Sequence, residues 1–205
     1  MLRQAYLSLT AALVIGAAAP GGVTASPPGA GPSEDGAAGA AVLRAAAVLK
    51  DVKGQRVGTL RVEDGGNGRT RLTIRTSNLP PGFHGLHIHR KGVCDPRSTD
   101  PATGSPFFSA GPHLGSGSHP GHAGDLPGLL VARNGAGGAS FVTDRFNVGD
   151  LLKAGGTSVV IHAKPDNEAN VPDRYTQSGK AGPDAETLKA GDSGGRIACG
   201  VIQRR

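Results

Sequence analysis

Aromatic side chains are scarce in this sequence. Its 205 residues include no tryptophan, two tyrosines and five phenylalanines. Proteins that bind single-stranded nucleic acid stack bases on such side chains, and the lysines and arginines here are scattered along the chain rather than clustered. The sequence therefore predicts no nucleic-acid partner, and its formal net charge of +6 says only that anionic partners are favoured in general.

The sequence also lacks a hydrophobic run long enough to cross a membrane as a helix. Its one long apolar stretch, Ala5 to Ala19, is interrupted by a glycine and followed by Pro20. Arg3 precedes this stretch, and Val23-Thr24-Ala25 supplies the small residues of a cleavage site. We interpret residues 1–25 as a cleaved secretory signal peptide rather than an uncleaved anchor. The mature protein is then expected to be secreted, with no membrane span.

Cysteine is limited to two residues, Cys94 and Cys199. An even number of cysteines in an exported chain suggests one disulfide, which would here close a very long loop. The chain-entropy model gives such a bond about 4 kcal/mol of stabilisation. Two separate buried thiols are the alternative.

Glycine and proline, by contrast, are abundant, with 34 and 15 residues. Residues 26–40 combine both with alanine and show no hydrophobic periodicity, which is typical of a disordered linker. The folded domain is expected over residues 41–205. Within it, residues 90–125 and 164–195 show no strand or helix pattern, so we expect two long functional loops there.

The rest of the domain is predicted to form short strands separated by turn sequences such as Asn134-Gly135. Almost no stretch has the periodicity of a helix. This pattern predicts an all-β fold, an eight-stranded antiparallel Greek-key sandwich or barrel of the immunoglobulin-like kind. The expected strands are residues 41–50, 56–63, 69–76, 84–89, 129–133, 139–146, 158–163 and 196–202.

All seven histidines lie between positions 84 and 162. Three of them belong to one expected strand, where His87 and His89 point to the same face about 7 Å apart because strand side chains alternate. The others, with a nearby aspartate, follow in the first long loop and on a later strand: His113, His119, His122, Asp125 and His162.

This clustering predicts a metal site. Imidazole ligands suit copper, zinc, iron or nickel. The only methionine is Met1, and no set of two histidines and a cysteine is apparent, so a blue-copper centre is disfavoured. A thiolate zinc finger is disfavoured as well if both cysteines are bridged.

Five motifs resemble those of the copper/zinc superoxide dismutases and occur in the family's order, and the resemblance covers residues 41–205. The family is a known example of the β-sandwich architecture, so the resemblance implies the same fold. The motifs are His84-Gly85-Leu86-His87-Ile88-His89, Ser109-Ala110-Gly111-Pro112-His113, His122-Ala123-Gly124-Asp125-Leu126, Val159-Val160-Ile161-His162 and Gly195-Arg196-Ile197-Ala198-Cys199-Gly200-Val201-Ile202.

The resemblance implies an oxidoreductase that dismutes superoxide to O₂ and hydrogen peroxide, with copper alternating between Cu(II) and Cu(I). His113 would be the ligand that bridges to zinc and carries a proton, and Arg196 would guide the superoxide anion. The alternative is a copper- or zinc-binding module or chaperone without catalysis, which would not need the arginine. The implied copper ligands are His87, His89, His113 and His162.

The zinc ligands depart from the family pattern. The resemblance implies zinc on His113, His119, His122 and Asp125, but the first and last of these are only twelve residues apart. The family includes copper-only members, with shortened or ligand-poor zinc loops, so both a zinc-loaded and a copper-only site stay open. If only one of His119 and His122 binds zinc, we favour His122, which keeps the family's spacing to the aspartate.

Further roles are implied by the resemblance alone. Cys94 and Cys199 match the family's disulfide. His84 matches a histidine that hydrogen-bonds backbone rather than metal. Asp166 matches a carboxylate that links a copper-binding histidine to a zinc-binding one.

The second long loop matches the family's electrostatic loop. Its lysines could focus the superoxide anion toward the site. They are Lys164, Lys180 and Lys189. Homodimers are common in the family, so a homodimer is one possible assembly, but no patch in the sequence is diagnostic of it.

Overall fold

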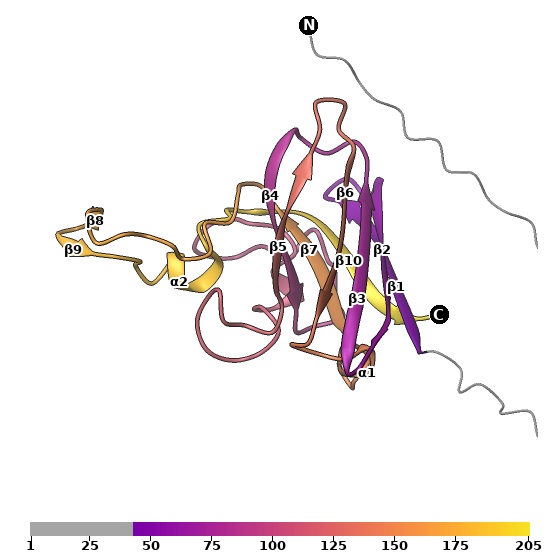
Figure 1. Cartoon of the computed structure of the whole chain (residues 1–205). Helices are drawn as coiled ribbons and strands as arrows, with labels where there is room; N and C mark the ends of the chain where they lie inside the picture. The colour runs from indigo at the N-terminus through magenta and orange to yellow at the C-terminus, as the bar shows by residue number, and fades with distance from the viewer. Residues whose placement is uncertain (1–42) are drawn as a thin grey trace, which may run out of the picture. The chain divides into compact units, whose positions relative to one another are not determined.

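The computed structural model describes residues 43–205 (Figure 1). The predicted signal peptide (1–25) and linker (26–40) lie outside the described residues, as do the first two residues of the predicted domain. Within the described range, no helix is both long enough and apolar enough to cross a bilayer.

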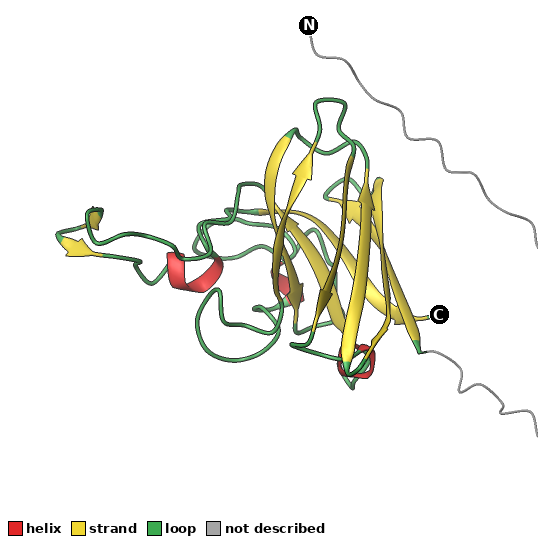
Figure 2. Cartoon of the chain, in the orientation of Figure 1, coloured by secondary structure: helices red, strands yellow, loops and turns green. Residues whose placement is uncertain are grey.

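Eight strands close into one antiparallel barrel (Figures 1 and 2). Their order around it is β1-β10-β7-β4-β5-β6-β3-β2, and the pairing of strands distant in sequence gives the crossovers of a Greek key. The predicted all-β, eight-stranded antiparallel fold is therefore confirmed. The strands are β1 (Arg44–Asp51), β2 (Arg56–Gly66), β3 (Arg69–Thr76), β4 (Gly82–His89), β5 (Asp125–Val131), β6 (Gly137–Thr143), β7 (Thr157–His162) and β10 (Arg196–Arg204).

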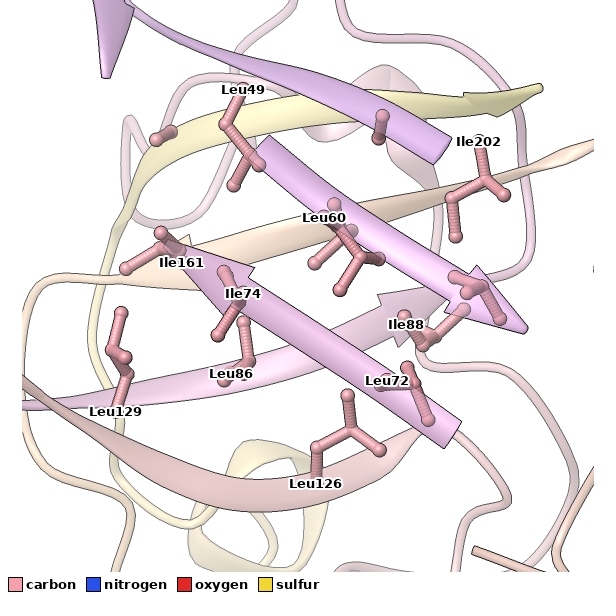
Figure 3. Packing of buried hydrophobic residues seen from close by; sticks show 14 of the residues in the cluster. Leu49, Leu60, Leu72, Ile74, Leu86, Ile88, Leu126, Leu129, Ile161 and Ile202 are labelled. Carbon is pink, nitrogen blue, oxygen red and sulfur yellow. The ribbon is translucent and has the colours of Figure 1, made fainter. Parts of the chain in front are cut away.

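The barrel interior is filled by every second strand residue. On β3, Leu72 and Ile74 are fully buried, whereas Arg71 and Arg75 on either side of them are exposed. Leu86 and Ile88 of β4 belong to the same apolar cluster (Figure 3). Each such side chain contributes roughly 1.5–3 kcal/mol when buried. A slip of one residue would turn these side chains outward, so the core fixes the strand register.

Some element boundaries differ from the prediction. β5 begins at Asp125, inside the region predicted as loop, and β6 ends at Thr143 rather than at Phe146. The chain leaves the strand there because Asn147 and Asp150 form a capping box that starts the short helix α1 (Val148–Leu151). The loops also contain η1 (Phe108–Ala110), β8 (Thr176–Gln177), β9 (Lys180–Ala181) and α2 (Thr187–Ala190).

β4 and β7 differ from the other strands because both faces of each are buried. Leu86 and Ile88 fill the barrel, so His87 and His89 lie on the outer face of the strand. The two long loops cover that outer face (Figure 2).

β7, β10 and the first long loop bring further functional side chains to this outer face. Ile161 of β7 is part of the core, so the next residue, His162, points outward. Arg196 of β10 lies directly opposite His162 in the register. An isolated bridge pairs His113 of the loop with His89. The fold thus gathers residues that are more than a hundred positions apart in sequence.

Candidate metal centre

Four histidines converge on the outer face of β4 and β7. Each offers one ring nitrogen, and these four nitrogens all lie within 4.8 Å of one another. Every one of the four residues is buried. One metal ion could therefore reach all four nitrogens. The residues of this first cluster are His87, His89, His113 and His162.

Hydrogen bonds fix the tautomers of two of these rings. His89 Nδ1 donates to the Gly111 carbonyl oxygen at 2.7 Å, and His162 Nδ1 donates to the Gly194 carbonyl oxygen at 2.9 Å. Because a carbonyl oxygen only accepts, each neutral ring carries its hydrogen on Nδ1 and a lone pair on Nε2. Both Nε2 atoms are buried and have no hydrogen-bond partner.

His87 is held the other way round. Its Nε2 donates to Asp166 Oδ2 at 2.7 Å, so its lone pair lies on Nδ1, which is also buried and unpartnered. Each buried polar atom without a partner costs about 1–3 kcal/mol. Three such lone pairs in one place fit a metal ion that accepts all of them.

Burial keeps these rings neutral. Desolvation lowers the pKa of His87 and of His89 well below the usual value, and the neighbouring histidines lower both further. Desolvation likewise lowers the pKa of His162 to about 3. It also lowers the pKa of His113, although the hydrogen bond with Asp125 opposes this shift. Neutral imidazole is the form that binds metal. No proton therefore has to leave His87, His89 or His162 at neutral pH.

A second cluster surrounds the carboxylate of Asp125. Asp125 Oδ1 lies 2.7 Å from His113 Nδ1 and 3.2 Å from His119 Nδ1. Asp125 Oδ2 lies 3.1 Å from His122 Nδ1. Three imidazole nitrogens and a carboxylate thus meet in one place, which is a donor set that suits tetrahedral zinc.

His119 shows that a cation fits this second cluster. Its Nε2 donates to Asp166 Oδ1 at 2.8 Å, which leaves the lone pair on Nδ1. That lone pair lies 3.2 Å from Asp125 Oδ1 and makes no hydrogen bond. A lone pair and a carboxylate oxygen repel each other at this distance unless a cation lies between them.

The surroundings of His119 and His122 differ. The His119 side chain is 1% exposed and that of His122 is 12% exposed. A second set of ligand atoms that lie within 4.8 Å of one another includes His119, along with His87, His113 and Asp125, but not His122. The second long loop holds His119 in place, since Leu188 accepts a hydrogen bond from its backbone nitrogen at 2.8 Å. Spacing within the first loop cannot reveal that contact.

Asp166 links the two clusters. Its two carboxylate oxygens accept hydrogen bonds from His87 at 2.7 Å and from His119 at 2.8 Å. The side chain is only 4% exposed, so water screens these bonds little. The contacts expected for Asp166 from the resemblance are therefore present.

Arg196 borders the first cluster and is fixed by three hydrogen bonds. Its Nη1 donates to the Phe107 carbonyl oxygen at 2.6 Å, its Nη2 to the Gly111 carbonyl oxygen at 2.8 Å, and its backbone nitrogen to Ser105 Oγ at 2.9 Å. Burial lowers the pKa of Arg196, and Asp100 opposes the shift. Arginine nevertheless stays protonated in proteins. A cation of fixed orientation therefore lies beside the four histidines.

Comparison with known proteins settles the family. Residues 56–202 match the family described as copper/zinc superoxide dismutase (SODC). A superoxide dismutase [Cu-Zn] of Mycolicibacterium paratuberculosis is 45% identical over 186 residues, which cover 86% of this chain and 81% of that protein. The chain belongs to the copper/zinc superoxide dismutase family. Its activity is the dismutation of superoxide.

A further curated relative supports the family assignment, and a solved structure supports the fold. A superoxide dismutase [Cu-Zn] of Mycobacterium tuberculosis is 46% identical over 158 residues, which cover 73% of this dismutase and 65% of that protein. Among solved structures, a SOD-like protein from Bacillus subtilis matches with a TM-score of 0.57 and 25% identity, over 76% of this chain and 96% of that one.

A cavity of about 530 Å³ lies against the first cluster of this dismutase. His162 and Arg196 border it. Of the three loop lysines, Lys164 and Lys189 line the cavity, whereas Lys180 lies in the exposed strand β9. The cavity is also lined by three carboxylates, those of Asp100, Glu186 and Asp192.

The predicted disulfide between Cys94 and Cys199 is confirmed. It ties the first long loop to β10, three residues beyond Arg196. Phe107 packs in the same small cluster as both cysteines and adopts a φ of 57°, which is uncommon for a bulky residue. The disulfide thus braces the loop residue whose carbonyl oxygen holds Arg196.

His84 stays outside both clusters. Its Nδ1 lies 2.7 Å from the His162 carbonyl oxygen, and its Nε2 lies 2.8 Å from the Pro80 carbonyl oxygen. The ring therefore contacts backbone on both sides, which is the role that the resemblance implied.

Two residues that position the site were not apparent from the sequence. Arg145, just after β6, places Nη1 within 3.3 Å of three carbonyl oxygens of the first loop, those of Pro120, His122 and Asp125. Gly191 ends α2 with a φ of 57°, and a Cβ there would overlap Asp166 Oδ1. No motif marks the arginine, and a glycine in a glycine-rich loop is only a weak signal.

Proposed function

We propose that this dismutase holds copper on the four ring nitrogens of the first cluster. The observation that carries the proposal is the set of three buried, unpartnered lone pairs on His87 Nδ1, His89 Nε2 and His162 Nε2. His113 completes the set with Nε2, because its Nδ1 faces Asp125. Four imidazole nitrogens are a donor set that suits copper.

Bound copper supplies the one-electron Cu(II)/Cu(I) couple by which one superoxide is oxidised to O₂ and a second is reduced to hydrogen peroxide. Arg196 binds and orients the anion. Its Nη1 and Nη2 each use one hydrogen on a carbonyl oxygen and keep another for the substrate. Lys164 and Lys189 also line the cavity, but the carboxylates of Asp100, Glu186 and Asp192 offset their charge. Attraction of the anion therefore depends on where the charges lie, and the guanidinium of Arg196 is the cation held in place beside the first cluster.

His113 is assigned the proton transfer. The His113 ring belongs to both clusters. Its Nδ1 is held 2.7 Å from Asp125 Oδ1 in the second cluster, which leaves Nε2 for the first. Nε2 is therefore the atom that can accept a proton and pass it to the reduced substrate when it is not bound to metal. The buried surroundings keep the ring in place during this transfer.

The second cluster is assigned to zinc, on His113, His119, His122 and Asp125, with His119 as the surer of the two loop ligands. This assignment is supported by the lone pair of His119 Nδ1 that faces Asp125 Oδ1. Zinc here would stiffen the compressed loop and orient His113. A copper-only enzyme, in which the cluster holds itself together by hydrogen bonds, is the competing form.

The disulfide supports an extracytoplasmic location, because such bonds persist in oxidising compartments. Residues 1–25 are accordingly assigned to a signal peptide that directs export. Residues 26–40 are assigned to a linker, and residues 41–205 to the catalytic domain.

Metal content and dismutation measured on the same preparations test this function. The mature protein should bind one copper per chain and dismute superoxide rapidly, whereas His162→Ala should lose both. The melting temperature of each protein reports whether the variant is folded. Copper bound at full occupancy with no dismutation would instead support the alternative of a metal-binding module without catalysis.

A further inference from the structure

The outer face of β1, β2 and β3 carries a concentration of arginines. Outward residues alternate on β3, which places Arg69, Arg71 and Arg75 on one exposed face. On β2, Arg61 lies opposite the outward Thr73 of β3, on the same face. Basic residues that are scattered along the sequence are therefore clustered in the fold, contrary to the expectation from their linear distribution.

The same face is hollowed along β1 and β2 into a groove of about 470 Å³. Small outward residues, Ala46 and Val48 of β1 and Thr59 of β2, lie among the lining residues, so the groove is open between longer side chains. Four arginines line it, namely Arg44, Arg56, Arg61 and Arg205.

Few carboxylates neutralise this face. Glu63 is the one acidic residue that lines the groove, and it lies 3.5 Å from Arg44 in an exposed pair. Asp51 and Asp64 lie at the adjacent turns, where one carboxylate oxygen of each accepts hydrogen bonds from backbone nitrogens. An exposed ion pair is worth roughly 0–1 kcal/mol, so the remaining arginines keep their charge available.

We propose that this face binds a linear acidic polysaccharide, a sugar chain that carries sulfate, phosphate or carboxylate groups. A guanidinium donates two parallel hydrogen bonds to each of these groups. Outward residues repeat about every 7 Å along a strand, and neighbouring strands lie about 5 Å apart. The arginines of β3 and those that line the groove therefore offer several cations on one face to an extended chain of anions.

The chemistry of the face favours a polysaccharide over other polyanions. Within residues 43–205 the exposed aromatic side chains are Phe83, Phe108 and Tyr175, and none of them belongs to β1, β2 or β3. The face therefore has no ring on which nucleic-acid bases could stack. It also offers little of the apolar surface that a membrane-binding face inserts at the lipid interface, since within residues 43–205 the one large apolar side chain exposed on β1, β2 or β3 is Val48.

Binding at this groove would leave the enzyme active. No residue lines both the groove and the cavity beside Arg196. Binding at the groove therefore does not depend on the metal assignments, and dismutation by the bound enzyme can be measured separately from binding.

Binding of the metal-loaded protein to fluorescent dextran sulfate, with uncharged dextran as the matched probe, tests the proposal. The wild type should bind dextran sulfate at low ionic strength and should not bind dextran. The triple variant Arg56→Gln/Arg61→Gln/Arg75→Gln should bind about tenfold more weakly, with a shallower dependence of log affinity on log salt. Polygalacturonate, which carries carboxylates, should compete if the site accepts that group as well.

A second triple variant, Arg97→Gln/Arg133→Gln/Arg174→Gln, removes the same charge from exposed positions elsewhere. It should keep the wild-type affinity within about twofold, since screening confines the interaction to nearby charges. Equal losses in both triple variants would overturn the proposal by showing that net charge alone drives binding. Tighter binding to anionic lipid vesicles or to duplex DNA than to dextran sulfate would overturn it in favour of those partners. Dismutation should be unchanged in both variants.

Discussion

The carbonyl oxygen of Gly111 accepts hydrogen bonds from both His89 Nδ1 and Arg196 Nη2. One backbone atom therefore orients a ring of the first cluster and the cation that binds the substrate. Gly111 has a φ of 74°, a conformation that glycine adopts at little cost. At the residue scale, the site depends on such fixed acceptors more than on the flexibility of its side chains.

Arg196→Ala should lower kcat/KM for superoxide by about tenfold or more, because a fixed cation is removed from the end of the cavity. Copper content should stay the same, since none of the three lone-pair nitrogens contacts this side chain. Arg196→Lys keeps the charge but loses the two guanidinium hydrogen bonds to carbonyl oxygens, so its kcat/KM should lie between those of the wild type and Arg196→Ala. A loss of copper in Arg196→Ala would contradict the role assigned to this residue.

Gly191→Ala should weaken metal retention by about 10- to 100-fold, the usual effect of displacing a carboxylate that orients a metal-bound histidine. The added Cβ would overlap Asp166 Oδ1 and lie 2.7 Å from His119 Nε2. Competition with a chelator measures the effect. Gly179→Ala in the same loop is the matched control, because its φ is also positive, at 78°, but nothing lies within 4 Å of the added atom. Equal losses in both variants would refute the overlap as the cause.

At the scale of elements, the compressed first loop is held from outside by Arg145. This side chain reaches three loop carbonyl oxygens, including those of His122 and Asp125. Arg145→Ala should lower zinc affinity by about tenfold while copper affinity changes little. Zinc release in the presence of a colorimetric chelator provides the measurement.

Arg133→Ala serves as the matched control for Arg145→Ala. Arg133 is exposed on the neighbouring turn between β5 and β6, and the described structure gives it no hydrogen bond to the first loop. It should retain zinc as the wild type does. Parallel release of zinc from both variants, or none from either, would show that the arginine does not brace the loop.

The strands were predictable and the loop contacts were not. Period-two alternation was enough to place His87 and His89 on one face, and the core residues follow the same rule. The position of His119 depends instead on Asp166 and Leu188, which lie in the other long loop. Contacts between two irregular segments leave no periodic signal, so spacing alone favoured His122.

At the scale of the whole molecule, the barrel separates two kinds of positive charge. Lys164, Lys189 and Arg196 line the cavity at the metal clusters, whereas Arg44, Arg56, Arg61 and Arg205 line the groove, and no residue lines both. The linear sequence does not reveal that the basic residues form two separate groups, because those of the cavity and those of the groove either alternate with apolar residues or lie in loops. The closed barrel creates it.

Acid should destabilise the metal-free protein. His162 has a pKa of about 3 when folded, against about 6.5 when unfolded, and the pKa values of His87 and His89 are lowered in the same direction. The unfolded chain thus binds more protons between these values, so stability is fully present above about pH 6.5 and is lost as the pH falls toward 3. Thermal melts of chelator-treated protein across this range measure the loss.

The variant His162→Gln provides the control for this pH dependence. It removes one buried histidine, so its melting temperature should fall less steeply with acid than that of the wild type. Asp125, whose folded pKa is lowered by its histidine neighbours although burial opposes the shift, acts in the same direction and remains in both proteins. A wild-type melting temperature that is flat from pH 7.5 to about 4.5 would be incompatible with buried neutral rings.

The most direct test of the two-cluster account is anomalous diffraction from crystals of the metal-loaded enzyme, recorded on either side of the copper and zinc absorption edges. A copper peak is expected among His87, His89, His113 and His162. A separate zinc peak is expected beside Asp125, with His113 between the two peaks. A copper peak outside the first cluster would contradict the central claim, and a single copper peak with no zinc would contradict the assignment of the second cluster.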